Sequence, residues 1–464
     1  MLKLQIVIRK SVKLFTSMSK IIIPKTKPDS FYFGITVLIL ASTLVSSCTS
    51  NPLQPITHTS QQEGHSYYSW AKGGSGAEGG QGNSIAVDKT GNCYVVGSFF
   101  HQIILDSITL NDNSMLGSFF AKYDANGNIL WAIPGNIDKI NFLSVLVDDS
   151  QNIYLGGKFS SGSKITNGVI LTQDASILKL DQKGNLIWSI PLPNSVGKIR
   201  IDSGGNIYVS AQSIYKISPS GVIQYTITSG NQNMWLNDLN VNGNGELYIT
   251  GRVMTGGIAF GNIIINTTVS KDLFLAKFDA YGNCVWAKNY GFGINKNDSG
   301  GAGICTDRAG NVYLSGYFEQ EYNIEGFHLT TPNGAAFFLA SYASDGKIKW
   351  LKNINAFLTS NGALKIDSRD YLYISGGYFN DLNFQSLSFS PAGNSLFVAK
   401  VDVFGNGIWI ENAECVDPAF VTDLFVDNAG NCFLTGQYQS GITLGSTSLS
   451  GSGLQFFLAK LNAH

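Results

Sequence analysis

The sequence predicts an all-β fold built from repeated four-stranded units, and three observations lead to it. One phrase, V-D-x-x-G-N-x-Y-x-x-G-x-F, begins near residues 87, 147, 201, 241, 306, 366 and 426. A second phrase, F-x-A-K-x-D-x-x-G-N-x-x-W, occupies 119–131, 176–188, 213–225, 274–286, 338–350 and 397–409. The seventh copy of the second phrase begins at 457–462 and stops, and its missing end, 67–72, precedes the first repeat. Such self-similarity indicates a repeat architecture.

Each phrase reads as a β-hairpin. Residues 84–88 and 93–99 are short β-prone runs on either side of a turn with Asp and Gly, and 119–124 and 129–132 repeat that pattern. Asp accepts backbone N–H groups in such turns, and Gly permits positive φ. Two hairpins give four strands per repeat, and four-stranded units repeated radially are propeller blades. We therefore expect a seven-bladed β-propeller of antiparallel blades, closed by pairing of 67–72 with 456–462.

The distance between repeats varies because of an insertion between the second and third strands. In the first repeat it covers 101–118 and contains two further β-prone runs, which suggests an extended excursion or a small extra hairpin. The third repeat runs directly from Ala211 to Ile214. We interpret the insertion as an ornament on a four-stranded frame.

One aromatic residue closes each repeat. A ring at the same position of every repeat predicts packing between blades, since each ring buries about 200 Å². The members are Trp70, Trp131, Trp188, Tyr225, Trp286, Trp350 and Trp409. Trp235 stands outside this ladder, before the first strand of its repeat. Core packing is the favoured interpretation of Trp235, and contact with a ligand is the alternative.

The repeats resemble the SBBP type of bacterial β-propeller repeat. The resemblance rests on 73–76, 83–99 and 119–132 of the first repeat, and it extends over about residues 65–464. It departs at Gln151, which replaces a turn glycine, and at 218–221, where S-P-S-G replaces D-x-x-G. The resemblance implies a seven-bladed propeller on secreted or surface proteins and implies no defined activity.

The N-terminal residues predict export and a lipid anchor. Three lysines, at 20, 25 and 27, precede the apolar run 31–45. The run is shorter than the ~20 residues of a membrane span, and a basic segment before a short apolar one is typical of a secretory signal. The run ends L-V-S-S-C, which resembles the bacterial lipobox and implies a diacylglyceryl group on Cys48. An uncleaved anchor and a plain signal peptide are the alternatives. A start at Met18 would give a signal of ordinary length.

These features predict three segments and a location. Residues 1–47 are the signal peptide, 48–64 a lipidated flexible tether, and 65–464 the propeller. Residues 1–47 hold seven Lys or Arg and one acidic residue, so the remainder holds 24 basic and 31 acidic residues, a net charge of −7. Nucleic-acid binding needs a basic surface, so we expect no nucleic-acid partner. We expect an exported, monomeric outer-membrane lipoprotein.

Catalytic, metal and cofactor residues are not evident in the sequence. The five histidines show no metal spacing, and no C-x-x-C occurs. The turn at 124–128 is similar to a calcium loop, but Gly135 stands where a bidentate acid is needed. The five cysteines after Cys48 fit buried, small hydrophobic side chains. A Cys284–Cys305 disulfide is the alternative.

The sequence thus favours a non-enzymatic, lipid-anchored propeller that binds protein or glycan, without a cofactor. An enzyme-like propeller, active on glycans or dependent on a quinone, is the alternative. Three or more convergent acids or arginines at the centre of the propeller would favour the enzyme. An empty or apolar centre would favour the binding module.

Overall fold

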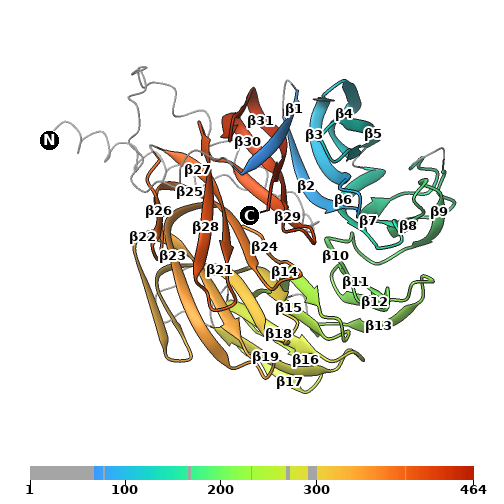
Figure 1. Cartoon of the computed structure of the whole chain (residues 1–464). Coiled ribbons are helices and arrows are strands. Elements are labelled where there is room, and N and C mark those ends of the chain that lie inside the picture. The colour runs from blue at the N-terminus through green and yellow to red at the C-terminus, as the bar shows by residue number, and fades with distance from the viewer. Residues whose placement is uncertain are drawn as a thin grey trace, which may run out of the picture. The chain divides into compact units, whose positions relative to one another are not determined.

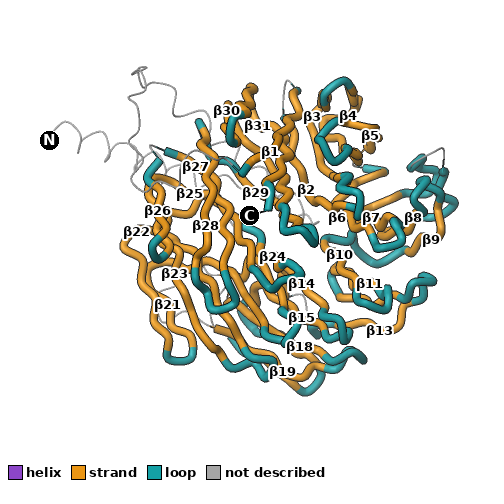
Figure 2. Tube along the Cα trace, viewed as in Figure 1, coloured by secondary structure: helices purple, strands orange, loops and turns teal. Residues whose placement is uncertain are grey.

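The computed structural model describes residues 67–76, 79–136, 138–165, 169–230, 233–267, 272–290, 300–360, 362–391 and 393–463 (Figure 1). They belong to one compact unit, His58–His464. Every regular element among them is a β-strand, so the all-β prediction is confirmed (Figure 2). The predicted signal segment 1–47 and tether 48–64 lie outside the described residues. Within the described part of the chain, no helix has the length and apolar character needed to cross a membrane.

The first repeat folds as a four-stranded antiparallel sheet. Strand β2 (Gly80–Val87) pairs with β3 (Cys93–Leu105), β3 pairs with β4 (Ile108–Tyr123), and β4 pairs with β5 (Ile129–Asn136). The first phrase supplies the turn between β2 and β3, and the second phrase supplies the turn between β4 and β5. The two predicted hairpins therefore share one sheet.

The later repeats build the same antiparallel sheet. The second contains β6 (Ile140–Val147), β7 (Ile153–Phe159), β8 (Ala175–Leu180) and β9 (Leu186–Ile190). The third contains β10 (Lys198–Ile201), β11 (Ile207–Ser210), β12 (Ile214–Ile217) and β13 (Ile223–Ile227). The fourth contains β14 (Met234–Val241), β15 (Leu247–Val253), β18 (Asp272–Phe278) and β19 (Cys284–Tyr290), with the hairpin β16 (Ile258–Phe260) and β17 (Ile263–Ile265).

The last three repeats have longer strands. The fifth contains β20 (Gly300–Thr306), β21 (Val312–Ile324), β22 (Phe327–Tyr342) and β23 (Ile348–Ser360). The sixth contains β24 (Leu364–Ile366), β25 (Leu372–Phe384), β27 (Asn394–Val401) and β28 (Gly407–Cys415), with β26 (Leu387–Phe389). The seventh contains β29 (Phe420–Val426), β30 (Cys432–Leu444) and β31 (Thr447–Leu461). Its fourth strand is β1 (Tyr68–Ser75), which pairs with β31 so that Trp70 faces Lys460.

Both phrases form the same turn. Asp124 Oδ1 accepts the backbone N–H groups of Asn126 (2.9 Å) and Asn128 (2.8 Å), and Oδ2 accepts the Asn128 side-chain amide (2.9 Å). Gly127 has a φ of +80°, a conformation that glycine adopts without steric cost. In the second repeat, Gln151 takes that place with a φ of +63°. The carboxylate oxygens of Asp124 are occupied by the turn itself, in agreement with a turn-forming role rather than a calcium loop.

The second glycine of the first phrase is required by a bulge in the first strand. A Cβ atom on Gly97 would lie 2.2 Å from the Gln81 carbonyl oxygen, beside the register shift between Gly82 and Ser84. The same close approach and shift recur at Gly157, Gly251 and Gly436. A bulge turns one carbonyl toward the neighbouring strand, so only glycine fits without displacement.

In the first, sixth and seventh repeats the insertion joins the sheet to the preceding repeat, so the interpretation of the insertion as an ornament was wrong for these three repeats. The end of β3 folds back onto the preceding repeat, where Leu105 pairs with Gly74 and Ile104 with Ser75. Strand β25 pairs in the same way with β23, and β30 with β28. We call the ends of the β3–β4, β25–β26 and β30–β31 hairpins (102–111, 382–389 and 441–450) the bridging hairpins. They supply main-chain hydrogen bonds between sheets that would otherwise meet only through side chains.

The aromatic ladder packs between repeats, as predicted. The indole Nε1 of Trp70 donates to the Ala125 carbonyl (3.2 Å), and a Cβ on Gly127 would lie 2.8 Å from the Trp70 ring. Trp188, Trp286 and Trp350 donate in the same way to the second-phrase turn of the next repeat, each at 3.1 Å. Trp409 is buried and stacks on Tyr67 at 5.2 Å. At four positions (70, 188, 286 and 350) the ladder residue therefore lies on the second-phrase turn of the next repeat, whereas Trp409 packs on Tyr67.

The cysteines behave as small hydrophobic side chains. Cys93, Cys305, Cys415 and Cys432 are buried free thiols, and Cys284 is a half-buried free thiol. The alternative Cys284–Cys305 disulfide is therefore wrong. Burial raises the pKa of the Cys284 thiol to about 11, which keeps it protonated and unreactive near neutral pH.

Candidate binding site

Trp235 is an exposed aromatic residue at the start of a first strand. It lies on β14 and keeps 62% of its surface exposed, so the favoured interpretation of core packing was wrong. Its cross-strand partner on β15 is Arg252. A large exposed indole is costly in water and is typical of contact surfaces when an arginine lies beside it. Contact between Trp235 and a ligand stays a prediction.

Arg252 connects Trp235 to the fifth repeat. Its guanidinium lies 5.3 Å from the centre of the Tyr317 ring and donates a hydrogen bond to the Tyr317 hydroxyl. The Arg252 Nε atom is buried and has no hydrogen-bond partner among the described residues. We call Trp235, Arg252 and Tyr317 the aromatic patch. It combines the exposed indole of Trp235 with a cation held in place by Tyr317, a combination that suits recognition of a sugar ring or a protein side chain.

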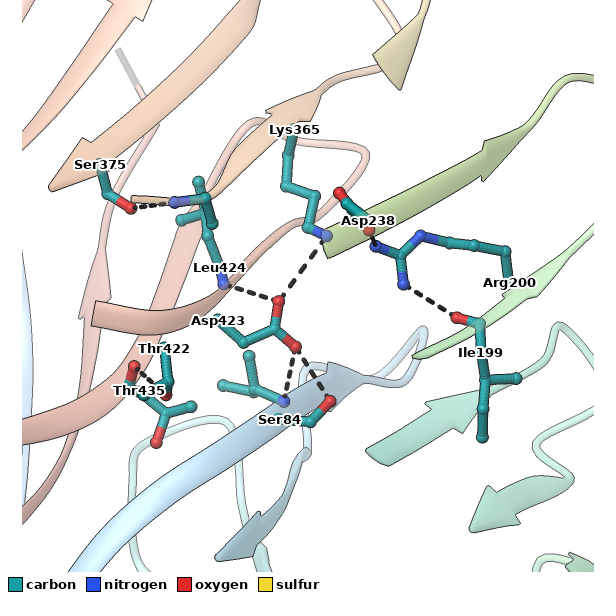
Figure 3. Close-up of polar contacts among 12 residues, drawn as sticks. Ser84, Ile199, Arg200, Asp238, Lys365, Ser375, Thr422, Asp423, Leu424 and Thr435 are labelled. Atoms are coloured by element: carbon teal, nitrogen blue, oxygen red, sulfur yellow. Dashed lines mark hydrogen bonds and ion pairs between the residues drawn. The ribbon is translucent and has the colours of Figure 1, made fainter. Parts of the chain in front are cut away.

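A second polar site lies among the first strands of the repeats. Four charged side chains meet there (Figure 3), and Lys198, which lies two residues before Arg200 on β10, acts on them through its charge. We call them the first-strand charge cluster: Lys198, Arg200, Asp238, Lys365 and Asp423. Arg200 Nη2 lies 2.5 Å from Asp238 Oδ1, and Lys365 Nζ lies 3.6 Å from Asp423 Oδ1. The cluster thus joins the third repeat to the fourth and the sixth to the seventh.

The Asp423 carboxylate of the cluster accepts hydrogen bonds from the first repeat and from its own strand. Asp423 Oδ2 accepts the Ser84 hydroxyl (2.9 Å) and the Ile85 N–H (3.2 Å), and Oδ1 accepts the Leu424 N–H (3.0 Å) (Figure 3). Burial raises the pKa of Asp423, but the charges of Lys365, Lys198 and Arg200 outweigh this effect, and the pKa lies below its ordinary value. Asp423 is therefore a charged joint between the seventh repeat and the first.

The cluster meets neither of the conditions set from the sequence. It holds two acids, one arginine and two lysines, so neither three acids nor three arginines converge in it, and it is not apolar. The four arginines of the repeats also contact different partners. Arg200 pairs with Asp238, Arg252 stacks on Tyr317, Arg308 pairs with Asp370, and Arg369 donates to the Ala429 carbonyl. The arrangement does not reproduce an arginine triad.

Metal-binding side chains are scattered over the described ranges. No set of three or more His, Cys, Asp or Glu side chains comes together there. His328 is exposed and contacts Asn323 at 2.7 Å. Cys48, His58, His65 and His464 lie outside the described residues. Sequence reasoning passed over Arg252 and the charge cluster because their residues share no motif and meet only through the packing of different repeats.

The comparisons with known proteins concern the repeat architecture. No family model matches the chain, so the resemblance to SBBP repeats stays a prediction. The chain is similar to an uncharacterized WD repeat-containing protein of Acanthamoeba polyphaga mimivirus, with 24% identity over 369 residues. The match covers 64% of this chain and 24% of that protein. The chain thus spans about a quarter of the length of this relative.

Two solved structures are similar to the chain. One is hydrazine synthase of Kuenenia stuttgartiensis, with a TM-score of 0.48, 10% identity, and coverage of 80% of this chain and 95% of that one. The other is BBS1N in complex with ARL6DN, with a TM-score of 0.42, 9% identity, and coverage of 84% and 94%. Neither likeness bears on activity. The repeated four-stranded antiparallel sheets and the WD-repeat relative make the chain a propeller-type repeat protein.

Proposed function

We propose that the chain is a seven-bladed β-propeller, anchored to the cell envelope through a lipid on Cys48, that binds a protein or glycan without catalysing a reaction. A propeller fold suits a binding or scaffold module, although the fold alone assigns no ligand. The observation that carries the proposal is the aromatic patch, where Trp235 is 62% exposed beside a guanidinium that is already fixed in place. A fixed cation and a rigid ring lose little conformational entropy on binding.

Ring closure is supported by contacts between the first and seventh repeats. The Thr422 hydroxyl donates to the Gly82 carbonyl (2.6 Å), Ser84 donates to Asp423, and Trp70 of the seventh sheet seats on the first-repeat turn. Each first strand also lies beside the first strands of the repeats before and after it, with β29 beside β2. These contacts are what a ring of seven blades requires. Deletion of 67–75 should therefore lower the thermal midpoint strongly, because it removes a strand from the seventh blade.

The lipid anchor is supported by the sequence alone. We propose that the thiol of Cys48 carries a diacylglyceryl group, which would hold the protein in the outer membrane with a second acyl chain on the new amine. The test is incorporation of an alkyne-labelled fatty acid by bacteria that express the full chain. Label should be present on the wild type and on Cys284→Ala, and absent from Cys48→Ala, which should also leave the membrane fraction. Label on Cys48→Ala would contradict the anchor.

Binding is tested with the full chain in detergent, against a glycan array and against extracted envelope proteins. Trp235→Ala should abolish capture of the ligand. Tyr281→Ala is the matched control, because Tyr281 is 82% exposed in a second-phrase turn of the same repeat. If the Trp235→Ala variant still captured the ligand, the aromatic patch would not be the binding site. Turnover of any member of the glycan library, or a quinone absorbance band of the purified protein, would show that the chain is an enzyme and not a binding module.

A further inference from the structure

We propose that the first-strand charge cluster binds one small oxyanion, a carboxylate or a phosphate. The inference is independent of the aromatic patch. It rests on three properties of the cluster: an excess of one positive charge, carboxylates that already accept several hydrogen bonds, and cations with unused donors on partly exposed side chains.

The charge excess follows from the sequence of the first strands. Strands β2, β6, β10, β14, β20, β24 and β29 contain three basic residues, Lys198, Arg200 and Lys365, and two acidic residues, Asp238 and Asp423. All the charged residues of these strands are therefore in the cluster. Its net charge is +1 at neutral pH, and charge held in a partly buried place is normally balanced.

The two acids leave one of the three positive charges unbalanced, and part of their hydrogen-bonding capacity is already used by other groups of the first strands. Asp423 accepts three hydrogen bonds, from Ser84, Ile85 and Leu424. Asp238 accepts the Leu239 N–H (2.9 Å) and the Ile304 N–H (3.3 Å), besides Arg200. Both carboxylates therefore serve mainly as joints between strands.

The cations retain donors that the described residues do not satisfy. An ammonium group has three donors. The Lys365 Nζ atom lies 3.6 Å from Asp423 Oδ1, which is too long for a hydrogen bond. Lys198 is half-buried and has no ion pair within the described ranges. Arg200 donates to the Ile199 carbonyl (2.9 Å) and to Asp238. The side chains of Arg200 and Lys365 remain 21% and 24% exposed, so the cluster is not sealed from water.

The electrostatics of Lys365 agree with an open anion position. Burial and the positive charge of Arg200 lower the pKa of Lys365, and Asp423 and Asp238 only partly oppose that effect. A bound anion would offset the repulsion among the three cations. Oxyanions form short, charge-assisted hydrogen bonds with ammonium and guanidinium groups, and one monoanion would cancel the excess charge.

The test is isothermal titration of the full chain in detergent and a zwitterionic buffer, with inorganic phosphate and with acetate. We expect one site per chain for at least one of the two. Lys198→Gln and Lys365→Gln should each weaken binding at least tenfold. Lys164→Gln, which changes an exposed lysine in the second repeat, should leave it unchanged. Titration with glucuronate in place of acetate distinguishes a carboxylate carried on a sugar from a free ion. Glucuronate should bind only if the site has room for the sugar ring.

Folding of the variants is monitored by the thermal midpoint. Lys198→Gln should change the midpoint little, because Lys198 makes no ion pair with any residue that the structure describes, so a loss of binding in this variant reports on the site itself. The absence of any heat of binding with both ions, or binding of equal strength in all variants, would overturn the proposal. Neither result would affect the role of Trp235, which is measured separately.

Discussion

Two parts of the repeat array differ in how neighbouring sheets are joined. The fifth, sixth, seventh and first repeats form one hydrogen-bonded sheet of 17 strands, whereas the second, third and fourth repeats each keep a separate four-stranded sheet (Figure 1). The bridging hairpins make this difference. They carry strand pairing from one repeat to the next, and the third repeat has no hairpin of this kind between β11 and β12.

The third repeat has lost several features together. Ala211 stands where the other first phrases have their second glycine, and the pairing of β10 with β11 has no register shift. The repeat contacts its neighbours through side chains instead: Trp188 donates to the Pro219 carbonyl (3.1 Å), and Lys216 donates to the Ala280 carbonyl (3.1 Å). The second and fourth repeats keep the bulge and its glycine and still form separate sheets. The comparison therefore teaches that the bridging hairpin, and not the bulge, joins neighbouring sheets by main-chain hydrogen bonds.

The largest effect is expected where a bridging hairpin buries its side chains. Leu105 is fully buried and packs against Gly74 of the preceding sheet. Leu105→Ala should lower the free energy of unfolding by about 2–5 kcal/mol, the usual range for a buried leucine. The control is Ile264→Ala in the β16–β17 hairpin, where the side chain is 63% exposed. If both variants lost the same small free energy of unfolding in denaturant titrations, the bridging hairpin would contribute little to stability.

The next effect compares the same position of the repeat in the two parts of the molecule. Gly97→Ala places a methyl group against the Gln81 carbonyl and should cost about 1–3 kcal/mol through overpacking. Ala211→Gly makes the opposite change in the third repeat and should cost no more than about 1 kcal/mol, from backbone entropy alone. Both values come from urea midpoints. A tolerated Gly97→Ala would mean that the bulge can relax.

The four-stranded frame could be predicted from the sequence because the same two phrases recur in the repeats. The turns follow from the spacing of Asp, Gly and Asn, and the ladder follows from the recurrence of Trp, so local chemistry determined both. The strand pairing that joins neighbouring sheets could not be predicted. Pairing of Leu105 with Gly74 depends on where one hairpin falls on the preceding repeat, and neither residue carries a motif.

The candidate sites were less predictable than the frame. Trp235 breaks the periodicity of the ladder and so stands out in the sequence, but its exposure follows only from the folded sheet. Lys365 and Arg200 lie on strands that are 165 positions apart in sequence, and only the packing of their repeats brings both to the same cluster. No single-sequence pattern records such a meeting, because the two residues share no spacing and no phrase.

A third prediction concerns the charged joint at Asp423. Its folded-state pKa lies below the ordinary value, so the unfolded chain binds the proton more tightly. The contribution of Asp423 is therefore fully present above about pH 4 and is lost as the pH falls through the lower folded-state value. Asp423→Asn should cost about 1–3 kcal/mol at pH 7, through weakened bonds to Ser84 and Ile85. It should also reduce the loss of stability between pH 5 and 2.

The control for this change is Asp149→Asn, because the Asp149 side chain is 91% exposed. Thermal midpoints measured across the pH series should follow the wild type for Asp149→Asn and diverge from it for Asp423→Asn. Parallel curves for all three proteins would show that the charge of Asp423 contributes nothing to the joint between the seventh repeat and the first.

The smallest effect tests whether the aromatic ladder works alike in both parts of the molecule. Trp188 and Trp350 each donate one indole hydrogen bond, at 3.1 Å, to a turn of the next repeat. Trp350 lies in the 17-stranded sheet, and Trp188 lies where the sheets are separate. Phenylalanine keeps most of the ring and removes the donor, so Trp188→Phe and Trp350→Phe should each cost about 1 kcal/mol. A much larger cost at Trp188, measured by urea midpoint, would mean that this indole bond carries a greater share of the stability where strand pairing between repeats is missing.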